Sequence, residues 1–218
     1  MDDKALVMLS GGLDSATCLY WAKAKFSEVL AITFNYFGRL DNEKRATTRL
    51  AHHANVRQLI EIDLPFVKEA CDFYNGNLKK SDADSRWSSY IPARNMIFYS
   101  IAAHYAEYLD IDWIVGGHNL HDVKFFKDAS KEYLERVNLL FKEACLLCND
   151  RHYRILLPLS ELDRREIIKL AISLKLPIEL TWSCHRDGDV HCGYCYACMQ
   201  RLEAFRSLGL QDPAFSIF

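Results

Sequence analysis

A short apolar run, followed by two glycines in a hydroxyl-rich turn, constrains this chain more than any other feature. Residues 5–9 read Ala-Leu-Val-Met-Leu, and residues 10–15 read Ser-Gly-Gly-Leu-Asp-Ser. The pattern predicts a buried strand, a tight turn and a helix over residues 16–25. Such a turn forms an anion cradle, because glycines let the backbone approach a phosphate and a helix N-terminus presents free amides. We therefore expect a phosphate site at the end of the first strand of an α/β fold.

The carboxylate of Asp14 points to a nucleotide with magnesium, because it would repel a bare phosphate unless a metal ion intervened. The alternative is a plain strand-to-helix turn in which Asp14 caps the helix. The loop is neither a Walker A loop nor the dinucleotide fingerprint. It resembles the pyrophosphate loop of the N-type ATP pyrophosphatases, such as GMP synthetase and NAD synthetase, which cut ATP between the α- and β-phosphates and adenylate a substrate oxygen. The expected nucleotide-binding residues are Leu9, Ser10, Gly11, Gly12, Leu13, Asp14 and Ser15, with Asp14 and Ser15 also catalytic.

Strands alternate with helices along the rest of the chain. We expect strands at residues 29–36, 56–62, 111–115 and 153–157, and helices at 42–55, 94–109, 130–148 and 163–174. The last helix opens with a capping box formed by Asp163 and Glu166. Residues 75–90 are polar and predict a loop that acts as a lid. The alternation predicts a Rossmann-like parallel sheet with helices on both faces, which the loop resemblance makes similar to the adenine nucleotide alpha-hydrolases.

Composition narrows the functional classes. The chain has 218 residues, of which 50% are hydrophobic, and a formal net charge of -2. This suits one globular domain and gives no broad attraction to nucleic acid or to a membrane surface. No apolar run approaches the roughly 20 residues that span a bilayer, and the charged start shows no signal peptide. We expect a cytoplasmic protein without direct nucleic-acid or membrane partners.

Four of the eight cysteines follow the pattern Cys-x7-Cys-x2-Cys-x2-Cys near the C-terminus. In a cytoplasmic chain, clustered cysteines favour metal binding over disulfides. Four thiolates predict a closed tetrahedral zinc site that is structural rather than catalytic. An iron–sulfur cluster is the alternative, and His185 or His191 could replace one ligand. The expected ligands are Cys184, Cys192, Cys195 and Cys198. We expect an ATP-pyrophosphatase α/β domain at 1–180 and a zinc-binding helical segment at 181–218 packed on it.

A second Cys-x2-Cys pair, Cys145 and Cys148, lies in an expected helix. Two cysteines on a buried helix face are the main interpretation, and a redox pair is the alternative. Cys18 and Cys71 read as small core residues. No nearby base marks any of these thiols as a nucleophile.

The loop and the cysteine cluster together resemble the 7-cyano-7-deazaguanine synthase family, over about residues 4–205. The matching segments are residues 9–15, Phe34-Asn35-Tyr36, Tyr90-Ile91-Pro92-Ala93-Arg94-Asn95, residues 117–128, Leu180-Thr181-Trp182-Ser183-Cys184 and the later cysteines. The Thr-Trp-Ser-Cys entry is far more specific than the loop. The resemblance implies that ATP, ammonia and 7-carboxy-7-deazaguanine give the nitrile through an adenylated acid and an amide. It also implies structural zinc, ATP with magnesium, and a homodimer.

The resemblance also suggests residue roles. Arg94 is expected to bind phosphate or the substrate carboxylate. Arg164 stands where the family has a lysine that meets the phosphates. Both arginines are expected to be catalytic, although either could be a surface residue. Phe34 and Tyr36 are expected to face the adenine or the deazaguanine, and are equally good core residues. Asp122 and Asp128 are expected to flank a polar loop after the fourth strand, where they would read the base edge or hold magnesium, or remain solvated. The expected substrate-binding residues are Arg94, Asn95, His118, Asp122 and Asp128.

One segment departs from the family pattern. Residues 126–131 read Phe-Lys-Asp-Ala-Ser-Lys, where the common bacterial form has Tyr-Pro-Asp-Cys-Arg-Pro. This leaves open a paralogue that stops at the amide, or that couples the acid to another amine, including a protein amine. Two further alternatives are a tRNA-thiolation-type pyrophosphatase, against which the net charge counts, and a non-catalytic zinc module, which leaves the phosphate loop unexplained.

Overall fold

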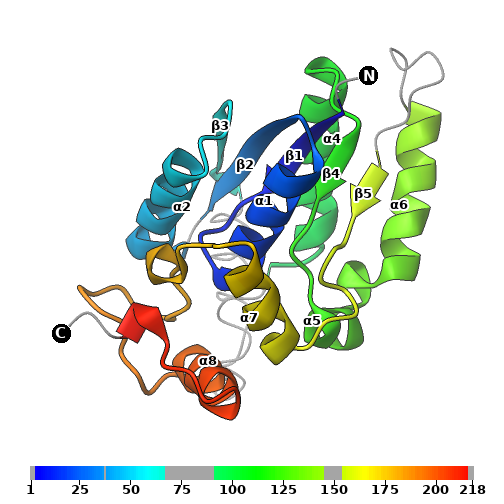
Figure 1. Cartoon of the computed structure of the whole chain (residues 1–218). Coiled ribbons are helices and arrows are strands. Elements are labelled where there is room, and N and C mark those ends of the chain that lie inside the picture. Colours follow the sequence, from blue (N-terminus) through cyan, green and yellow to red (C-terminus); the bar gives the residue numbers. More distant parts are fainter. Residues whose placement is uncertain (1–2, 37, 67–90, 145–153, 216–218) are drawn as a thin grey trace.

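The computed structural model describes residues 3–36, 38–66, 91–144 and 154–215, and contains a five-stranded parallel sheet (Figure 1). The strands are β1 (Lys4–Met8), β2 (Glu28–Tyr36), β3 (Leu59–Leu64), β4 (Trp113–Val115) and β5 (Arg154–Leu156). Their order is β3-β2-β1-β4-β5, and every neighbouring pair is parallel. The predicted parallel sheet is confirmed, with the third strand displaced from 56–62 to 59–64.

The helices are α1 (Leu13–Lys25), α2 (Asp41–His53), α4 (Arg94–Tyr108), α5 (Leu120–Phe125), α6 (Lys131–Ala144), α7 (Arg164–Ser173) and α8 (Tyr196–Ser207). Short 3-10 helices lie at Lys127–Ala129, Ile178–Leu180 and Pro213–Phe215. The capping box of α7 is confirmed: Asp163 accepts the N–H groups of Arg165 and Glu166, and Glu166 accepts that of Asp163 at 2.7 Å. Helix α1 begins earlier than predicted because Gly12 is its N-cap, so Asp14 lies in the first turn and does not cap it.

The prediction of a polar loop after β4 is wrong. Residues 120–125 form helix α5, and residues 127–129 form a 3-10 helix, so Asp122 and Asp128 both lie on helical turns. Asn119 starts α5 with a capping box, because its side chain accepts from the third residue of the helix and Asp122 bonds back to the Asn119 N–H. These local bonds stabilise a helix of only six residues, none of which is buried.

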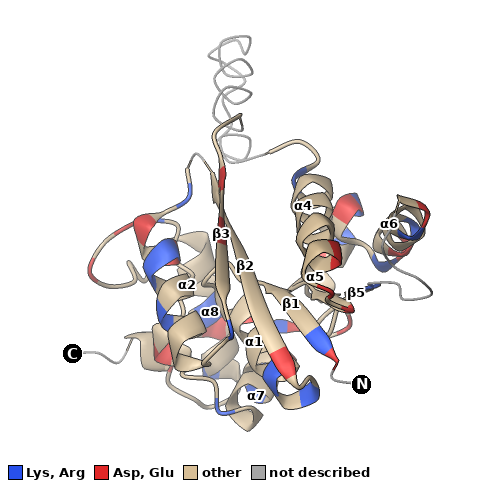
Figure 2. Ribbon diagram, turned by 90° about the horizontal axis from the view of Figure 1, so that it is seen from above, with Lys and Arg blue, Asp and Glu red and all other residues tan. Residues whose placement is uncertain are grey.

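Alternate residues of each strand pack into two separate hydrophobic cores, one on each face of the sheet. Val7 of β1 packs on one face with α1, α2 and α7, whereas Leu6 packs on the other with α4 and α6. This follows from the two-residue period of a strand, and it explains the continuous apolar runs of β1 and β2. Figure 2 shows the sheet between the two helical layers, with acidic and basic residues mixed on the outer sides of α2 and α6.

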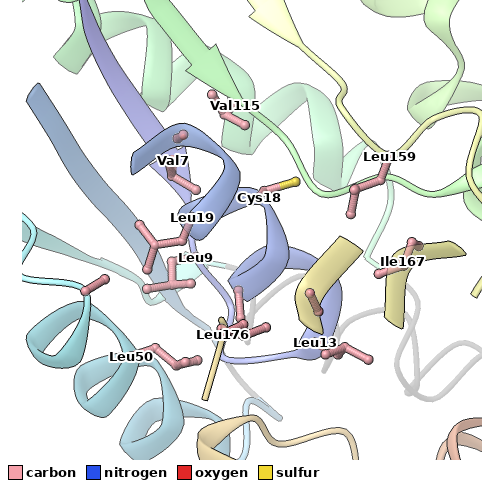
Figure 3. Close-up of a cluster of buried hydrophobic side chains, with 14 of the residues drawn as sticks. Val7, Leu9, Leu13, Cys18, Leu19, Leu50, Val115, Leu159, Ile167 and Leu176 are labelled. Carbon is pink, nitrogen blue, oxygen red and sulfur yellow. The ribbon is translucent and has the colours of Figure 1, made fainter. Parts of the chain in front are cut away.

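The core around α1 carries the strand-to-helix turn (Figure 3). Leu19 and Cys18 of α1 are fully buried, and they pack with Val7 and Leu9 at the end of β1 and with Val115 of β4. Leu50 of α2 and Ile167 of α7 close the same cluster. The loop after β1 is thereby fixed between β2 and β4, where the strand order reverses and open α/β sheets place their ligands.

The C-terminal part of the chain joins this core. Ala204 and Phe205 of α8 belong to the same buried cluster as α1 and α7. Arg201 of α8 is only 1% exposed and forms an ion pair with the fully buried Asp212, at 2.6 Å from Nε to Oδ2. In Figure 1 this segment, orange to red, lies below α2 and α7. The residues of the cysteine cluster are therefore held against the end of the sheet that bears the loop.

Candidate functional site

A pocket of about 380 Å³ opens at the carboxyl ends of β1, β2 and β4. It gathers most of the residues that the sequence suggested, although they come from five separate segments. The suggested residues that line it are Leu9, Ser10, Gly12, Leu13, Asp14, Ser15, Phe34, Tyr36, Arg94, Asn95, His118, Asp122 and Arg164. Among the described residues, Gly11 and Asp128 lie just outside this lining.

The loop after β1 is held by its own serines and by close packing against α2. Ser15 Oγ accepts the Ser10 N–H at 3.1 Å and donates to the Gly12 carbonyl at 3.1 Å. Gly11 has a φ of +91°, and a Cβ atom there would lie 2.5 Å from the carbonyl oxygen of Glu43. Only glycine satisfies both conditions. Gly11 therefore sets the shape of the cradle without facing the pocket.

Asp14 lies in the first turn of α1 and faces the pocket. Its Oδ2 accepts a hydrogen bond of 2.7 Å from Nδ2 of Asn119. Burial raises the pKa of the Asp14 carboxyl; the Asn119 bond and the charge of Arg164 oppose this, and the charge of Asp122 adds to it. Carboxylate oxygens are the ligands that magnesium prefers, so Asp14 and Asp122 form a donor set that fits this ion.

Arg94 opens helix α4 at the pocket edge. The preceding residue, Ala93, has a φ of +52°, a left-handed conformation that is uncommon for alanine and turns the chain into the helix. Burial raises the pKa of the Tyr36 hydroxyl, and Arg94 lies close enough to Tyr36 for its charge to oppose this rise. The Asn95 N–H donates to Oδ2 of Asp128 at 3.4 Å. Asp128 thus touches the start of α4 rather than the pocket.

Aromatic rings form one wall of the pocket. Phe34 of β2 stacks on Phe98 of α4 with ring centroids 4.2 Å apart and an angle of 11° between the planes. Tyr36 lies 5.8 Å from the same Phe98 ring. Phe34 is only 6% exposed, so it serves the core and the pocket wall together. The wall offers a flat apolar surface for a planar ring.

The sequence analysis missed two charged residues that line the pocket, Arg39 in the turn after β2 and Glu43 on α2. The guanidinium of Arg39 is buried and donates to the Phe34 carbonyl, to Asn35 Oδ1 and to Thr47 Oγ1 at 2.8–2.9 Å. Glu43 on α2 lines the same pocket, and burial raises the pKa of its carboxyl while Arg39 opposes the rise. The sequence offered little signal for either, because a charged helix start reads as solvated.

His118 follows β4 and lies beside Tyr99 of α4, with ring centroids 5.8 Å apart. Burial lowers the pKa of His118, so the imidazole is neutral near pH 7. Its Nε2 atom and the hydroxyl of Tyr99 are buried, with no hydrogen-bond partner among the described residues. A neutral imidazole can accept or donate one hydrogen bond in the pocket.

The segment that enters the cysteine cluster forms the remaining wall. The Trp182 N–H donates to the Gly11 carbonyl at 2.9 Å, and both Trp182 and Ser183 line the pocket. Arg201, which also lines it, donates to Thr181 Oγ1 at 2.8 Å and Ser183 Oγ at 2.9 Å. Arg201 had no sequence signal, because a lone arginine on a helix usually reads as exposed.

The four cysteines lie close enough to share one ion. Their Sγ atoms are all within 4.8 Å of one another, and the Cys192–Cys198 and Cys195–Cys184 pairs are 3.9 Å apart. A tetrahedral ion with Zn–S bonds of about 2.3 Å requires S–S edges of about 3.8 Å. In a four-iron cluster each thiolate binds a different iron, which requires wider spacing. The donor set fits a single closed metal ion.

The fold is of the adenine nucleotide alpha-hydrolase-like class. An NMN synthetase from Francisella tularensis superposes with a TM-score of 0.53 at 16% identity, over 96% of this chain and 78% of that one. The tRNA thiolase NcsA from Methanococcus maripaludis, with its [4Fe-4S] cluster, gives a TM-score of 0.50 at 19% identity, over 95% of this chain and 66% of that one. At such identities the likeness shows the fold alone.

Within that class the family is clear. Residues 4–209 match the family described as Queuosine biosynthesis protein QueC. A 7-cyano-7-deazaguanine synthase of Thermoplasma volcanium is 35% identical over 98% of this chain and 90% of its own length. Another from Nostoc punctiforme is 36% identical over 96% and 98%. The chain belongs to the QueC family, as its sequence resemblance predicted, and is thus an enzyme of the queuosine pathway.

No helix in the described parts of the chain has both the length and the apolar character needed to cross a membrane. The predicted loop at 75–90 and the pair Cys145 and Cys148 fall outside the described residues.

Proposed function

We propose that this protein converts 7-carboxy-7-deazaguanine and ammonia to 7-cyano-7-deazaguanine at the expense of ATP. The observation that carries the proposal is the contact between the phosphate loop and the Thr-Trp-Ser-Cys segment at one pocket, through the Trp182–Gly11 bond. The loop supplies a site for the nucleotide, and the second segment is the more specific mark of the family. Relatives that carry the synthase name match over nearly the whole chain.

The chemistry requires two activations of oxygen. The substrate carboxylate attacks the α-phosphorus of ATP and releases pyrophosphate, and ammonia then attacks the adenylated carbon and displaces AMP to leave an amide. The amide oxygen then attacks the α-phosphorus of a second ATP and releases a second pyrophosphate, and loss of AMP and the two amide protons leaves the nitrile. Positioning and charge neutralisation do most of this work, which suits a pocket with several fixed cations and no cysteine nucleophile among its lining residues.

The loop residues bind the phosphates in this proposal. Ser10, Gly12 and Ser15 line the pocket at the N-terminus of α1, where the helix dipole favours an anion. Asp14 and Asp122 would hold magnesium, which supplies neutralisation of the phosphate oxygens when bound. Arg164, which lines the pocket and whose charge acts on Asp14, would stabilise the departing pyrophosphate.

The other wall binds the planar ligands. Phe34, Phe98 and Tyr36 provide a flat apolar surface. Arg94, beside Tyr36, can pair with the substrate carboxylate in bidentate geometry. Asn95 and His118 offer hydrogen bonds to the base, and Asp128 supports Asn95 from outside the pocket.

Zinc is the proposed occupant of the four-cysteine group, because the sulfur spacing suits one tetrahedral ion. Its role is structural, since four thiolates leave no open position. The division into residues 1–180 and a packed segment at 181–218 is supported by the contacts of Arg201 and Phe205. A homodimer remains a proposal that rests on the family resemblance.

The alternative product is the amide, or a conjugate with another amine. Residues 126–131 support this alternative, because the cysteine and the arginine of the common family pattern are both missing there. Phe126 of the same segment is 48% exposed. In this alternative the adenylation step and its residues are unchanged.

Incubation of the purified protein with ATP, magnesium, ammonium and 7-carboxy-7-deazaguanine tests the proposal. We expect AMP and pyrophosphate, formed only when the acid is present, and a mass matching the nitrile. A product that stays at the amide supports the alternative. ADP as the nucleotide product, or no cleavage with any amine, contradicts the proposed function.

A further inference from the structure

Asn119, which the sequence analysis did not assign, lies between the two pocket carboxylates. It is only 5% exposed and ends the segment that follows β4. Its Oδ1 accepts the N–H groups of His121 and Asp122 at 2.8 and 3.0 Å. Backbone N–H groups can only donate, so this fixes which end of the amide is oxygen. Nδ2 must then point the other way, to Asp14 Oδ2 at 2.7 Å.

The same residue also holds Asp122. The Asn119 N–H donates to Oδ2 of Asp122 at 3.2 Å. Asp14 and Asp122 therefore each accept a hydrogen bond from Asn119 through one carboxylate oxygen. Among the described residues, no donor bonds the Oδ1 atom of either Asp14 or Asp122, and both side chains line the pocket. One oxygen of each acid is left to face the ligand.

Electrostatics explain why a neutral amide lies between the two acids. Asp14 and Asp122 are close enough for the charge of Asp122 to raise the pKa of Asp14, so without a cation they repel each other. The Asn119 bond opposes this rise. A carboxylate that is held by an outer partner presents a fixed ligand geometry, and loss of such a partner typically weakens metal binding about 10- to 100-fold.

We propose that Asn119 is a positioning residue that aligns Asp14 and Asp122 for one divalent cation brought in with the nucleotide. The inference rests on the proposed function, because it takes the cation to accompany ATP. Asn119 itself touches neither the nucleotide nor the cation. It ties the first turn of α1 to the first turn of α5, so the two acids move as one unit.

Asn119→Ser separates this role from helix capping. Serine caps a helix about as well as asparagine, but it is too short to carry the amide donor to Asp14. Asn119→Thr repeats the test with a second capping hydroxyl. Ser130→Ala is the matched control, because Ser130 Oγ accepts the Tyr133 N–H at the start of α6, so this variant loses a helix cap at a residue that does not line the pocket.

The probe is Mn²⁺, titrated into the full-length protein with an ATP analogue that has a methylene group between the α- and β-phosphates, and followed by the paramagnetic resonance signal of free Mn²⁺. We expect the Kd for Mn²⁺ to rise at least about 10-fold in both Asn119 variants, with melting temperatures no lower than that of Ser130→Ala. Equal Mn²⁺ affinity in the wild type and both Asn119 variants overturns the inference, as does a loss of affinity that only accompanies unfolding. If the wild type binds no Mn²⁺ with the analogue, the proposed function itself fails, and the inference with it.

Discussion

The N–H of Trp182 donates a hydrogen bond of 2.9 Å to the carbonyl oxygen of Gly11, across 171 positions of sequence. This bond joins the entry of the cysteine cluster to the phosphate loop. Gly11 is also packed against Glu43 of α2. Gly11 of the loop therefore contacts two further elements, helix α2 and the cysteine segment. Its conformation sets how these three parts fit together.

Gly11 and Gly12 should respond differently to alanine. Gly11→Ala places a Cβ atom 2.5 Å from the Glu43 carbonyl at a φ of +91°, so we expect a loss of about 1–3 kcal/mol or more in unfolding free energy. Gly12→Ala meets no atom closer than 3.6 Å and has a φ of -77°, so it should cost about 1 kcal/mol or less. Urea denaturation of both variants checks this. Equal stabilities would contradict the packing described here.

Asp14→Asn should abolish turnover without unfolding the protein. The carboxylate faces the pocket, and the amide that replaces it can still accept the bond from Asn119. We expect the rate of AMP release to fall on the order of 10²-fold or more, with an unchanged melting temperature or a higher one. Glu132→Gln, an exposed position on α6, is the matched control for loss of a charge. Near-normal turnover in Asp14→Asn would remove Asp14 from the site.

The difference in stability between Asp14→Asn and the wild type should depend on pH in a defined direction. Burial raises the pKa of Asp14 in the folded state, so the folded protein binds this proton more tightly than the unfolded chain does. The stability of the wild type then falls as pH rises from the ordinary pKa of an aspartate through the raised value. In metal-free buffer, the advantage of Asp14→Asn over the wild type should grow across that range and then level off. Urea titrations at several pH values measure it, and a constant difference would contradict the shift.

Much of the fold and part of the site follow from local sequence patterns. The apolar runs of β1 and β2 and the capping box of Asp163 and Glu166 predicted their elements, because these signals act within a few residues. The same signature marks the start of α5, where Asn119 is followed three residues later by Asp122. The polar composition of the segment instead predicts a loop. Asn119 could have been found from its capping signature.

Residues whose roles depend on distant partners could not be predicted. Arg39 is buried because three acceptors from β2 and α2 meet its guanidinium, and Arg201 because Asp212 and the turn at residues 178–183 surround it. Nothing in the neighbouring sequence distinguishes either from a solvated arginine. Phe98 likewise appeared only as one apolar residue of α4 until the fold stacked it on Phe34.

The contributions of Arg201 and Asp212 to the free energy of unfolding should depend on each other. Both side chains are buried, at 1% and 0% exposure, and two nitrogens of the guanidinium bond the carboxylate at 2.6 and 3.0 Å. Removing one partner leaves a buried charge, which costs about 3–5 kcal/mol. We expect Arg201→Met to lose about that much in urea unfolding, and Arg201→Met with Asp212→Leu to lose less than the sum of the two single variants. Additive losses would show that the two side chains act independently.

Metal removal should weaken the nucleotide site although the cysteines do not line it. The cluster positions Trp182 and Ser183, which form one wall of the pocket, and the Trp182–Gly11 bond reaches the loop. We expect one zinc per chain by elemental analysis. A thiol-competing chelator or Cys195→Ser should lower the melting temperature, because metal binding and folding of such a segment are coupled.

In the chelated protein, the affinity for a non-hydrolysable ATP analogue, measured by calorimetry with magnesium present, should fall about 10-fold, and added zinc should restore it. Iron with labile sulfide in the purified protein would contradict the zinc assignment. Unchanged nucleotide affinity after complete metal loss would show that the cluster does not support the pocket.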